Sequence, residues 1–208
     1  MKLFPNQYYH IYNRTNNGEI LFRTNDNYGY FIKKYRYYME KYFDTIGYCL
    51  MPTHFHFLVK IKEPEQLPNE VSDVQHLADV GHLSLSIEQL EVSTLISKAM
   101  QTLQSSYTKA INKMYHRHGS LFQAHYKAKH IDDDNYLITL LAYIHQNPLR
   151  TGIVAKPEEW HYSSYLDYFD FRNGTLPSKQ LILSMINKDD FKLFSSKLIQ
   201  HVDQKYWI

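Results

Sequence analysis

Hydrophobic and polar positions along the chain follow two repeats, one typical of strands and the other typical of helices. Short β-prone runs bounded by turn residues indicate strands, and apolar residues three and four positions apart indicate helices with one buried face. The pattern predicts a strand at 7–12, a helix from Asn25 or Asp26 to about Tyr42, strands at 45–50 and 54–61, a helix from Ser93 to about His118, a strand at 121–131 and a helix at 132–147.

The order of these elements indicates a fold class. The first six follow the strand and helix order of a ferredoxin-like domain, which is an α+β fold. We therefore expect a ferredoxin-like (RRM-like) antiparallel sheet with helices on one face, and one further helix after the last core strand. That helix should end by Asn147, because Pro148 disfavours helical backbone in the residue before it.

Two stretches keep neither repeat. Residues 62–91 contain Pro64 and Pro68, are acidic and have no regular period, so we predict an exposed loop or insertion there. Residues 171–208 are expected to form a C-terminal extension that is partly helical near 189–200. The prediction is therefore a single domain at 1–170, followed by this extension.

Composition excludes several classes of protein. With 208 residues, 44% of them hydrophobic and 21% charged, the chain is typical of a folded domain with an appendage and not of a disordered protein. No apolar run approaches the roughly 18 residues that a membrane span needs, and no signal-peptide pattern is present. The single Cys49 excludes an intrachain disulfide and a cysteine metal cage. A cytoplasmic protein with no membrane partner is expected.

Charge is unevenly distributed, although the formal net charge is only +2. Residues 62–91 hold seven acids and one base, whereas residues 92–131 hold six bases, four histidines and no acid. Aromatic residues are interleaved with these bases, and the whole chain has 19 tyrosines. A basic surface with aromatic side chains suits a single nucleic-acid strand. A solvated basic helix face is the alternative interpretation.

His54 and His56 form the first candidate site. Side chains in a strand alternate between its faces, so both imidazoles point the same way and Phe55 points the other way. Two neutral imidazoles can share one divalent metal ion. The alternative is a pair of partly exposed histidines without a metal. A histidine triad is excluded, because the next alternate position is Leu58.

Tyr143 and Asn147 form the second candidate site, four positions apart on one face of the last predicted helix. Asn147 could add an oxygen ligand to a metal held by the two histidines. A phenol with a pKa of about 10 is a weak nucleophile at neutral pH, unless a metal polarises its electrophile, for example a phosphodiester. Tyr136 shares the helix face but lies about 10 Å away along the axis. The alternative is a packed Tyr143 and an Asn147 that caps the helix.

Five short motifs occur in order along the chain, at residues 9–14 (YHIYNR), 51–59 (MPTHFHFLV), 119–123 (GSLFQ), 143–148 (YIHQNP) and 160–165 (WHYSSY). Together they resemble the REP-associated tyrosine transposase branch of the single-tyrosine HUH transposases. The resemblance covers roughly residues 8–168. Insertion-sequence relatives have glutamine at the position of Asn147, so asparagine favours the REP-associated branch.

The resemblance implies metal-dependent cleavage and strand transfer of single-stranded DNA, often beside a hairpin, in DNA transposition or the processing of REP hairpins. His54 and His56 match the pair that holds Mg²⁺ or Mn²⁺. Tyr143 matches the nucleophile that forms a 5′-phosphotyrosine and leaves a free 3′-OH. Asn147 matches a polar position that could supply a third metal ligand. Because the reaction is a transesterification, strands can be rejoined without ATP.

Three basic residues are candidate contacts to DNA phosphates, with a plain surface role as the alternative: Arg14, Lys127 and Lys129. Some relatives build their active sites as dimers and others act as monomers, so both a monomer and a homodimer stay open. A domesticated protein that binds structured single-stranded DNA without strand transfer is a second hypothesis. Metal-dependent hydrolysis, with Tyr143 in a structural role only, is a third.

Overall fold

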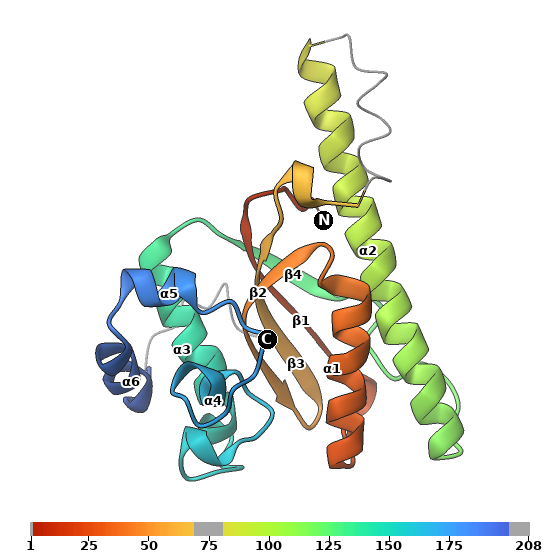
Figure 1. The fold of residues 1–208 in the computed structure, drawn as a ribbon. Helices are drawn as coiled ribbons and strands as arrows, with labels where there is room; N and C mark the ends of the chain where they lie inside the picture. Colours follow the sequence, from red (N-terminus) through yellow and green to blue (C-terminus); the bar gives the residue numbers. More distant parts are fainter. Residues whose placement is uncertain (1, 69–80, 200–208) are drawn as a thin grey trace.

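Four antiparallel strands form the centre of the computed structural model, which describes residues 2–68 and 81–199 (Figure 1). The strands are β1 (Tyr8–Arg14), β2 (Phe43–Met51), β3 (His54–Ile61) and β4 (Lys127–Ile131). They lie in the order β2-β3-β1-β4, so β2 and β4 are the edges of the sheet. Each neighbouring pair is antiparallel, which confirms the ferredoxin-like sheet predicted from the order of elements.

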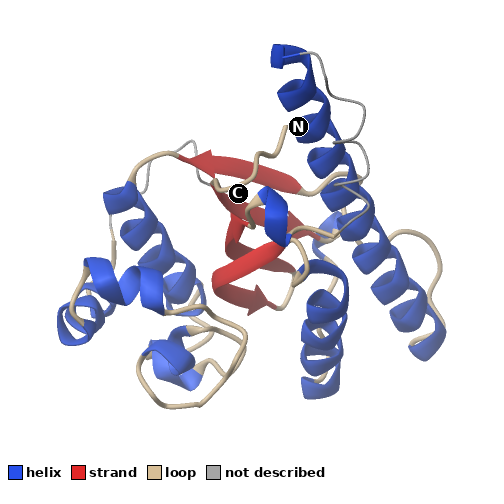
Figure 2. Ribbon diagram, turned by 45° about the horizontal axis from the view of Figure 1, so that its top comes forward, coloured by secondary structure: helices blue, strands red, loops and turns tan. Residues whose placement is uncertain are grey.

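Helices lie on both sides of this sheet (Figures 1 and 2). They are α1 (Asn25–Met39), α2 (Gly81–Met114), α3 (Asp134–Arg150), α4 (Tyr165–Tyr168), α5 (Gln180–Met185) and α6 (Lys188–Ser196). On one face, Phe55 and Phe57 of β3 pack with Phe31 of α1 and with α2. On the other face, Leu58 packs in a second apolar cluster with residues of α3, among them Leu141. The pair of helices expected on one face is thus confirmed, and the helix after β4 covers the opposite face.

The predicted exposed loop at 62–91 is wrong over its second part. After the short 3₁₀ turn Pro64–Gln66, helix α2 begins at Gly81 and not at Ser93. Residues 69–80 of the predicted loop lie outside the described residues. The prediction of a loop rested on the acidic composition and overlooked apolar residues with helical spacing upstream of Ser93, at Leu83, Ile87 and Leu90.

The predicted strand at 121–131 is wrong over its first half, because β4 begins only at Lys127. Phe122 is buried in the core and makes one isolated bridge to Thr15, beyond the end of β1. Gln123 donates its backbone N–H to the carbonyl of Arg14 over 2.9 Å. The consecutive apolar residues Leu121 and Phe122 therefore led to the prediction of a strand, although the segment 121–126 only passes the end of β1.

Helix ends also differ from the prediction. Helix α1 begins after Thr24, so neither of the two expected caps stands at its N-cap, and it ends at Met39, before Tyr42. Helix α2 ends at Met114, before the predicted end near His118. For α3, Asp133 is the N-cap, and its side chain accepts hydrogen bonds from two backbone N–H groups of the first turn.

The prediction that the last helix stops by Asn147 is wrong, because α3 continues through Pro148 to Arg150. Proline has no N–H to offer the carbonyl four residues earlier, which belongs to Ile144. The side chain of Asn147 replaces that donor: its Nδ2 donates to Ile144 O over 3.3 Å and to Tyr143 O over 3.2 Å. The asparagine thus offsets the lost hydrogen bond within the helix.

Helix α3 approaches the edge strand β2 closely at Gly47. A Cβ at this glycine would lie 2.2 Å from Leu141 Cδ1 and 3.2 Å from Ser164 Oγ. Ser164 Oγ accepts a hydrogen bond from Tyr48 N over 2.8 Å and lies 2.8 Å from His145 Nε2 of α3. The segment before α4 therefore fastens α3 to β2.

The C-terminal extension packs against α3 as well. Phe191 of α6 is buried in the second apolar cluster. The side-chain amide of Gln146 in α3 donates to Ser195 O over 2.7 Å and to Lys197 O over 2.8 Å. The helix expected near 189–200 is α6, and Gln200 lies outside the described residues. The separation of a domain at 1–170 from an extension at 171–208 stays a prediction.

No helix within the described residues is both long enough and apolar enough to cross a membrane.

The contact at Gly47 leads to a stability prediction. Gly47→Ala should lower the free energy of unfolding by about 1–3 kcal/mol, because the new methyl group overlaps a fully packed leucine. Gly29→Ala is the matched control: Gly29 lies within α1 with nothing near its Cβ position, so alanine should raise stability by up to about 1 kcal/mol. Urea unfolding of both variants measures the two changes. Equal stability of both variants would contradict the close approach.

His145 leads to a pH prediction. Burial lowers the pKa of this histidine from 6.5 to about 3. At pH values between 3 and 6.5 the folded state therefore binds fewer protons than the unfolded state. The contribution of the neutral, buried His145 to stability is fully present above pH 6.5 and is lost as the pH falls toward 3. In His145→Gln the free energy of unfolding should depend less steeply on pH: between pH 6.5 and 5 its slope should be smaller by roughly 1 kcal/mol per pH unit. Denaturant titrations at several pH values test this, and parallel slopes for both proteins would contradict it.

Candidate functional site

The candidate site begins with two rows of side chains that cross the sheet. In one row His56 of β3 lies opposite Tyr12 of β1, which in turn lies opposite Lys127 of β4. In the next row His54 lies opposite Arg14. Side chains directly opposite each other in a sheet share a face. The histidine pair and two of the predicted DNA contacts therefore lie on the same face, which is the one that α3 covers.

A third histidine, His10 of β1, joins the pair. Its Nε2 lies 2.9 Å from His56 Nδ1, and the two rings stack with centroids 5.1 Å apart. On the other side of His56, the ring of His54 lies at a centroid distance of 5.1 Å. Lys129, the remaining predicted DNA contact, lies opposite His10 on β4. The structure thus brings the imidazoles of His10, His56 and His54 side by side, and we call these three residues the histidine row. The sheet face that carries them, together with basic side chains, is called the histidine face.

Two buried ring nitrogens of this row, His56 Nε2 and His10 Nδ1, have no hydrogen-bond partner among the described residues. His56 is fully buried, and its Nδ1 is engaged by His10, so Nε2 is its free nitrogen. A buried polar atom left unpaired costs about 1–3 kcal/mol, and a metal ion bound at His56 Nε2 would remove that cost. His54 Nδ1 lies 3.0 Å from Thr53 Oγ1, which leaves its Nε2 as the nitrogen to bind a metal. The donor atoms fit a divalent ion.

Burial keeps these imidazoles uncharged. Burial, together with the positive charge of Arg14, lowers the pKa of His54 to about 4. Burial also holds the pKa of His56 well below its ordinary value, with His10 and His54 adding to the effect. Because neutral imidazole is the form that binds metals, the pair is ready to bind at neutral pH.

The protein supplies only part of a coordination shell here. Among the residues that the structure describes, no group of three or more His, Cys, Asp and Glu side chains is arranged to hold a metal ion. Mg²⁺ commonly keeps several waters and takes phosphate oxygens from its substrate. Two histidines on a face that also carries basic side chains could therefore hold such an ion together with waters and substrate oxygens.

Tyr143 lies on α3 and is half-buried against the second apolar cluster. The guanidinium of Arg150 lies 5.1 Å from the centre of its ring. Burial raises the pKa of the Tyr143 phenol, and the positive charge of Arg150 acts in the opposite direction. Arg150 is itself held by a hydrogen bond of 2.6 Å to Ile199 O, so the extension positions the cation beside the phenol.

Asn147 is buried one turn after Tyr143, as the spacing predicts. Its Nδ2 is used by the helix carbonyls described above, so Oδ1 is the atom that could bind a metal. Among the contacts of the described residues, none joins Tyr143 or Asn147 directly to His54 or His56. The predicted roles of Asn147 as a ligand and of Tyr143 as the nucleophile stay predictions, as does a homodimer.

Three residues of the site were missed by sequence reasoning: His10, Tyr12 and Arg150. His10 and Tyr12 lie within the first motif, and the alternation of β1 places both on the face of the histidine pair. The same period-two argument that paired His54 with His56 could have found them. Arg150 was missed because the helix was expected to end before it.

Comparisons with known proteins agree with the fold and with the family resemblance. A protein of Haemophilus influenzae described as a REP-associated tyrosine transposase is 25% identical over 136 residues, which are 65% of this chain and 66% of that protein. A solved REP-associated tyrosine transposase bound to a REP hairpin matches 83% of this chain and 84% of its own, with a TM-score of 0.54 and 15% identity.

No protein-family model matches the chain. The curated relative nevertheless bears the family name inferred from the five motifs. The solved structure shares the fold, with its four-stranded antiparallel sheet. The resemblance of this chain to the REP-associated tyrosine transposases is therefore confirmed.

Proposed function

We propose that this protein is a transposase-like enzyme that binds hairpin-containing single-stranded DNA, cleaves it and transfers the cleaved strand. One observation carries the proposal: the unpartnered, fully buried Nε2 of His56 lies beside His54 on the face that also carries Arg14 and Lys127. This combination offers metal ligands and phosphate contacts together. The curated relative and the structural neighbour support the transposase family and a DNA partner.

In the proposed reaction, His54 and His56 would hold Mg²⁺ or Mn²⁺, and the ion would supply Lewis-acid polarisation of the scissile phosphodiester. Tyr143 Oη attacks the phosphorus and loses its proton, and the bond from phosphorus to the 3′ oxygen breaks. The 3′ oxygen takes up a proton, and the 5′ phosphate stays bound to the tyrosine. Arg150 beside the ring favours the phenolate that this attack requires. The reverse reaction with another 3′-OH joins strands.

Tyr143→Phe should abolish the covalent adduct, because it removes the attacking oxygen and leaves the packed ring in place. We expect the yield of a denaturation-resistant protein–DNA band to fall below detection, while hairpin DNA binding stays within about twofold. Tyr136→Phe on the same helix is the matched control and should keep full adduct formation. Labelled hairpin oligonucleotides with Mn²⁺, analysed on a denaturing gel, measure the adduct.

The label also separates the competing hypotheses. An adduct that persists in Tyr143→Phe would contradict the assigned nucleophile. Cleaved DNA with a free 5′ end and no adduct would indicate metal-dependent hydrolysis. Tight binding of the hairpin by the unaltered protein, with no cleavage product, would indicate a protein that only binds structured DNA.

His56→Ala should remove Mn²⁺ binding, because it deletes one of the two imidazoles that the protein offers. We expect affinity to fall by more than about 100-fold, which is the upper range for losing only an outer hydrogen-bond partner of a ligand. His118→Ala, at an exposed position after α2, is the control and should bind as the unaltered protein does. Calorimetric titration of folded protein with Mn²⁺ gives both affinities, and unchanged binding by His56→Ala would exclude this metal site.

A further inference from the structure

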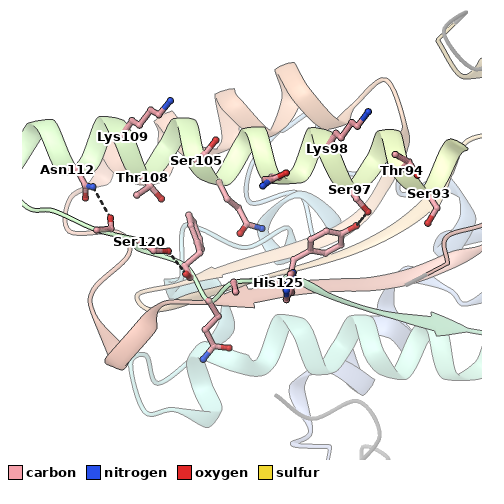
Figure 3. A pocket seen from close by; sticks show the side chains of 17 residues that line it. Ser93, Thr94, Ser97, Lys98, Ser105, Thr108, Lys109, Asn112, Ser120 and His125 are labelled. Carbon is pink, nitrogen blue, oxygen red and sulfur yellow. Dashed lines mark hydrogen bonds between the residues drawn. The ribbon is translucent and has the colours of Figure 1, made fainter. Parts of the chain in front are cut away.

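A polar groove lies between α2 and the segment 119–126 (Figure 3). Helix α2 packs with Phe55 and Phe57, so it lies on the side of the sheet away from the histidine row. Its volume is about 820 Å³, which is within the range of sites that bind organic ligands. Ser97, Thr108 and Asn112 point from α2 toward the segment, and Lys98 and Lys109 extend outward at the rim (Figure 3). None of the residues that line the groove is an Asp or Glu.

Gln104 lies in the floor of this groove with an unpaired donor. The residue is only 9% exposed, and its Nε2 has no hydrogen-bond partner among the described residues. Its Oε1 accepts a hydrogen bond of 2.9 Å from Asn13 Nδ2. The amide of Gln104 therefore has two N–H bonds that no described residue uses.

A hydrogen-bond chain fixes this orientation. Asn13 Oδ1 accepts from the backbone N–H of Arg14 over 2.8 Å, and that N–H can only donate. Asn13 Nδ2 must then be the donor to Gln104 Oε1 and to Gln123 O, the latter over 3.1 Å. Because Gln104 is thereby required to accept through its oxygen, its nitrogen faces the groove. The groove thus presents a preset donor to an acceptor on a ligand.

The surroundings favour an anionic ligand that also has flat apolar parts. Lys98 and Lys109 lie at the rim, and residues 92–131 contain no acid that would repel a phosphate. The partly exposed ring of Tyr126 lines the groove, with its Oη held 3.1 Å from Ser97 Oγ, and the buried Phe122 lies at its base. Positive charge combined with aromatic rings and amide donors is the chemistry that binds single-stranded nucleic acid.

The groove is also connected to the histidine face at the edge of the sheet. Tyr126 lines the groove, and the next residue, Lys127, lies on β4 in the row of His56. At the end of β1, Asn13 holds the groove amide while Arg14 lies opposite His54. A strand of DNA that leaves the groove over β4 would therefore meet the basic side chains of the proposed catalytic face.

We propose that this groove binds the single-stranded DNA that flanks the hairpin, with Gln104 Nε2 donating to a phosphate or base oxygen of that strand. This inference rests on the proposed function, because it assumes a DNA substrate with a single-stranded flank. It assigns the groove as a binding site for the flank in addition to the histidine face, where the proposed cleavage takes place.

Gln104→Glu tests the donor. A carboxylate still accepts from Asn13, but it presents a negative oxygen to the groove in place of N–H. In protein that also carries Tyr143→Phe, with EDTA present, we expect about 10-fold or greater loss of affinity for a labelled hairpin with a ten-nucleotide flank. Thr102→Glu is the matched control, since it adds the same charge to an exposed position of α2 and should stay within about twofold.

Two further binding measurements test whether a loss of affinity in Gln104→Glu comes from the contact between the groove and the flank. The same hairpin without a flank should bind Gln104→Glu and the parent protein equally. The double variant Lys98→Gln and Lys109→Gln, at exposed positions, should weaken binding of the flanked hairpin and reduce the slope of log affinity against log salt by about 1.4, from two lost phosphate contacts.

Equal binding of the flanked hairpin by parent, Gln104→Glu and the double lysine variant would overturn the inference. Equal loss with Thr102→Glu or with the flankless hairpin would overturn it too. A failure of the proposed strand transfer can be distinguished from a failure of this inference. In the first case the unaltered protein would form no adduct with Mn²⁺, while its DNA affinity would still depend on the flank.

Discussion

The close packing of α3 on the edge strand β2 is the contact on which the arrangement of the site depends. At Gly47 the strand has no side chain, and Leu141 fills the space that a Cβ would occupy. Ser164 then links the backbone of Tyr48 to His145, so three segments distant in sequence are fixed at one point. Tyr143 lies two residues beyond Leu141 on the same helix. Any shift of α3 along β2 would therefore move the proposed nucleophile relative to the histidine row.

Each proposed site contains a buried polar atom without a hydrogen-bond partner. Buried polar groups in folded proteins are nearly always hydrogen-bonded. Among the described residues His56 Nε2 and Gln104 Nε2 are exceptions, as are His10 Nδ1, His145 Nδ1 and Ser195 Oγ. What His56 and Gln104 share is that the other polar atom of the side chain is held by β1, through His10 and Asn13. The tied atom fixes how the side chain is oriented, and the unsatisfied atom is left for a ligand. A side chain with one polar atom held by the protein and another free to bind is typical of preorganised binding groups.

The fold could be predicted from the sequence wherever a repeat was long enough to be unambiguous. The alternation of His54, Phe55 and His56 gave the correct faces of β3, and the order of elements gave the correct sheet. Errors arose where a local signal was overridden by a contact distant in sequence. Pro148 is the clearest case, because the amide of Asn147 replaces the hydrogen bond that proline removes. The start of α2 was missed because an acidic composition concealed helical spacing.

The site could be predicted only in part, for a related reason. A period of two identifies which residues of one strand share a face, but it does not say which strands are neighbours. His10 became part of the site only once β1 was known to pair with β3. Gln104 could not be found in advance, because on α2 it is one of several polar residues at the border of the apolar face.

The two faces of the sheet share β1 as their common support. Asn13 and Arg14 are consecutive, and strand geometry sends them to opposite faces. One orients the donor of the groove, and the other lies opposite His54. Because both are set by the same backbone, the positions of the groove and of the histidine row cannot vary independently. A substrate that spans both would thus be held at a fixed distance from His54 and His56, which is what the proposed cleavage at one defined phosphate requires.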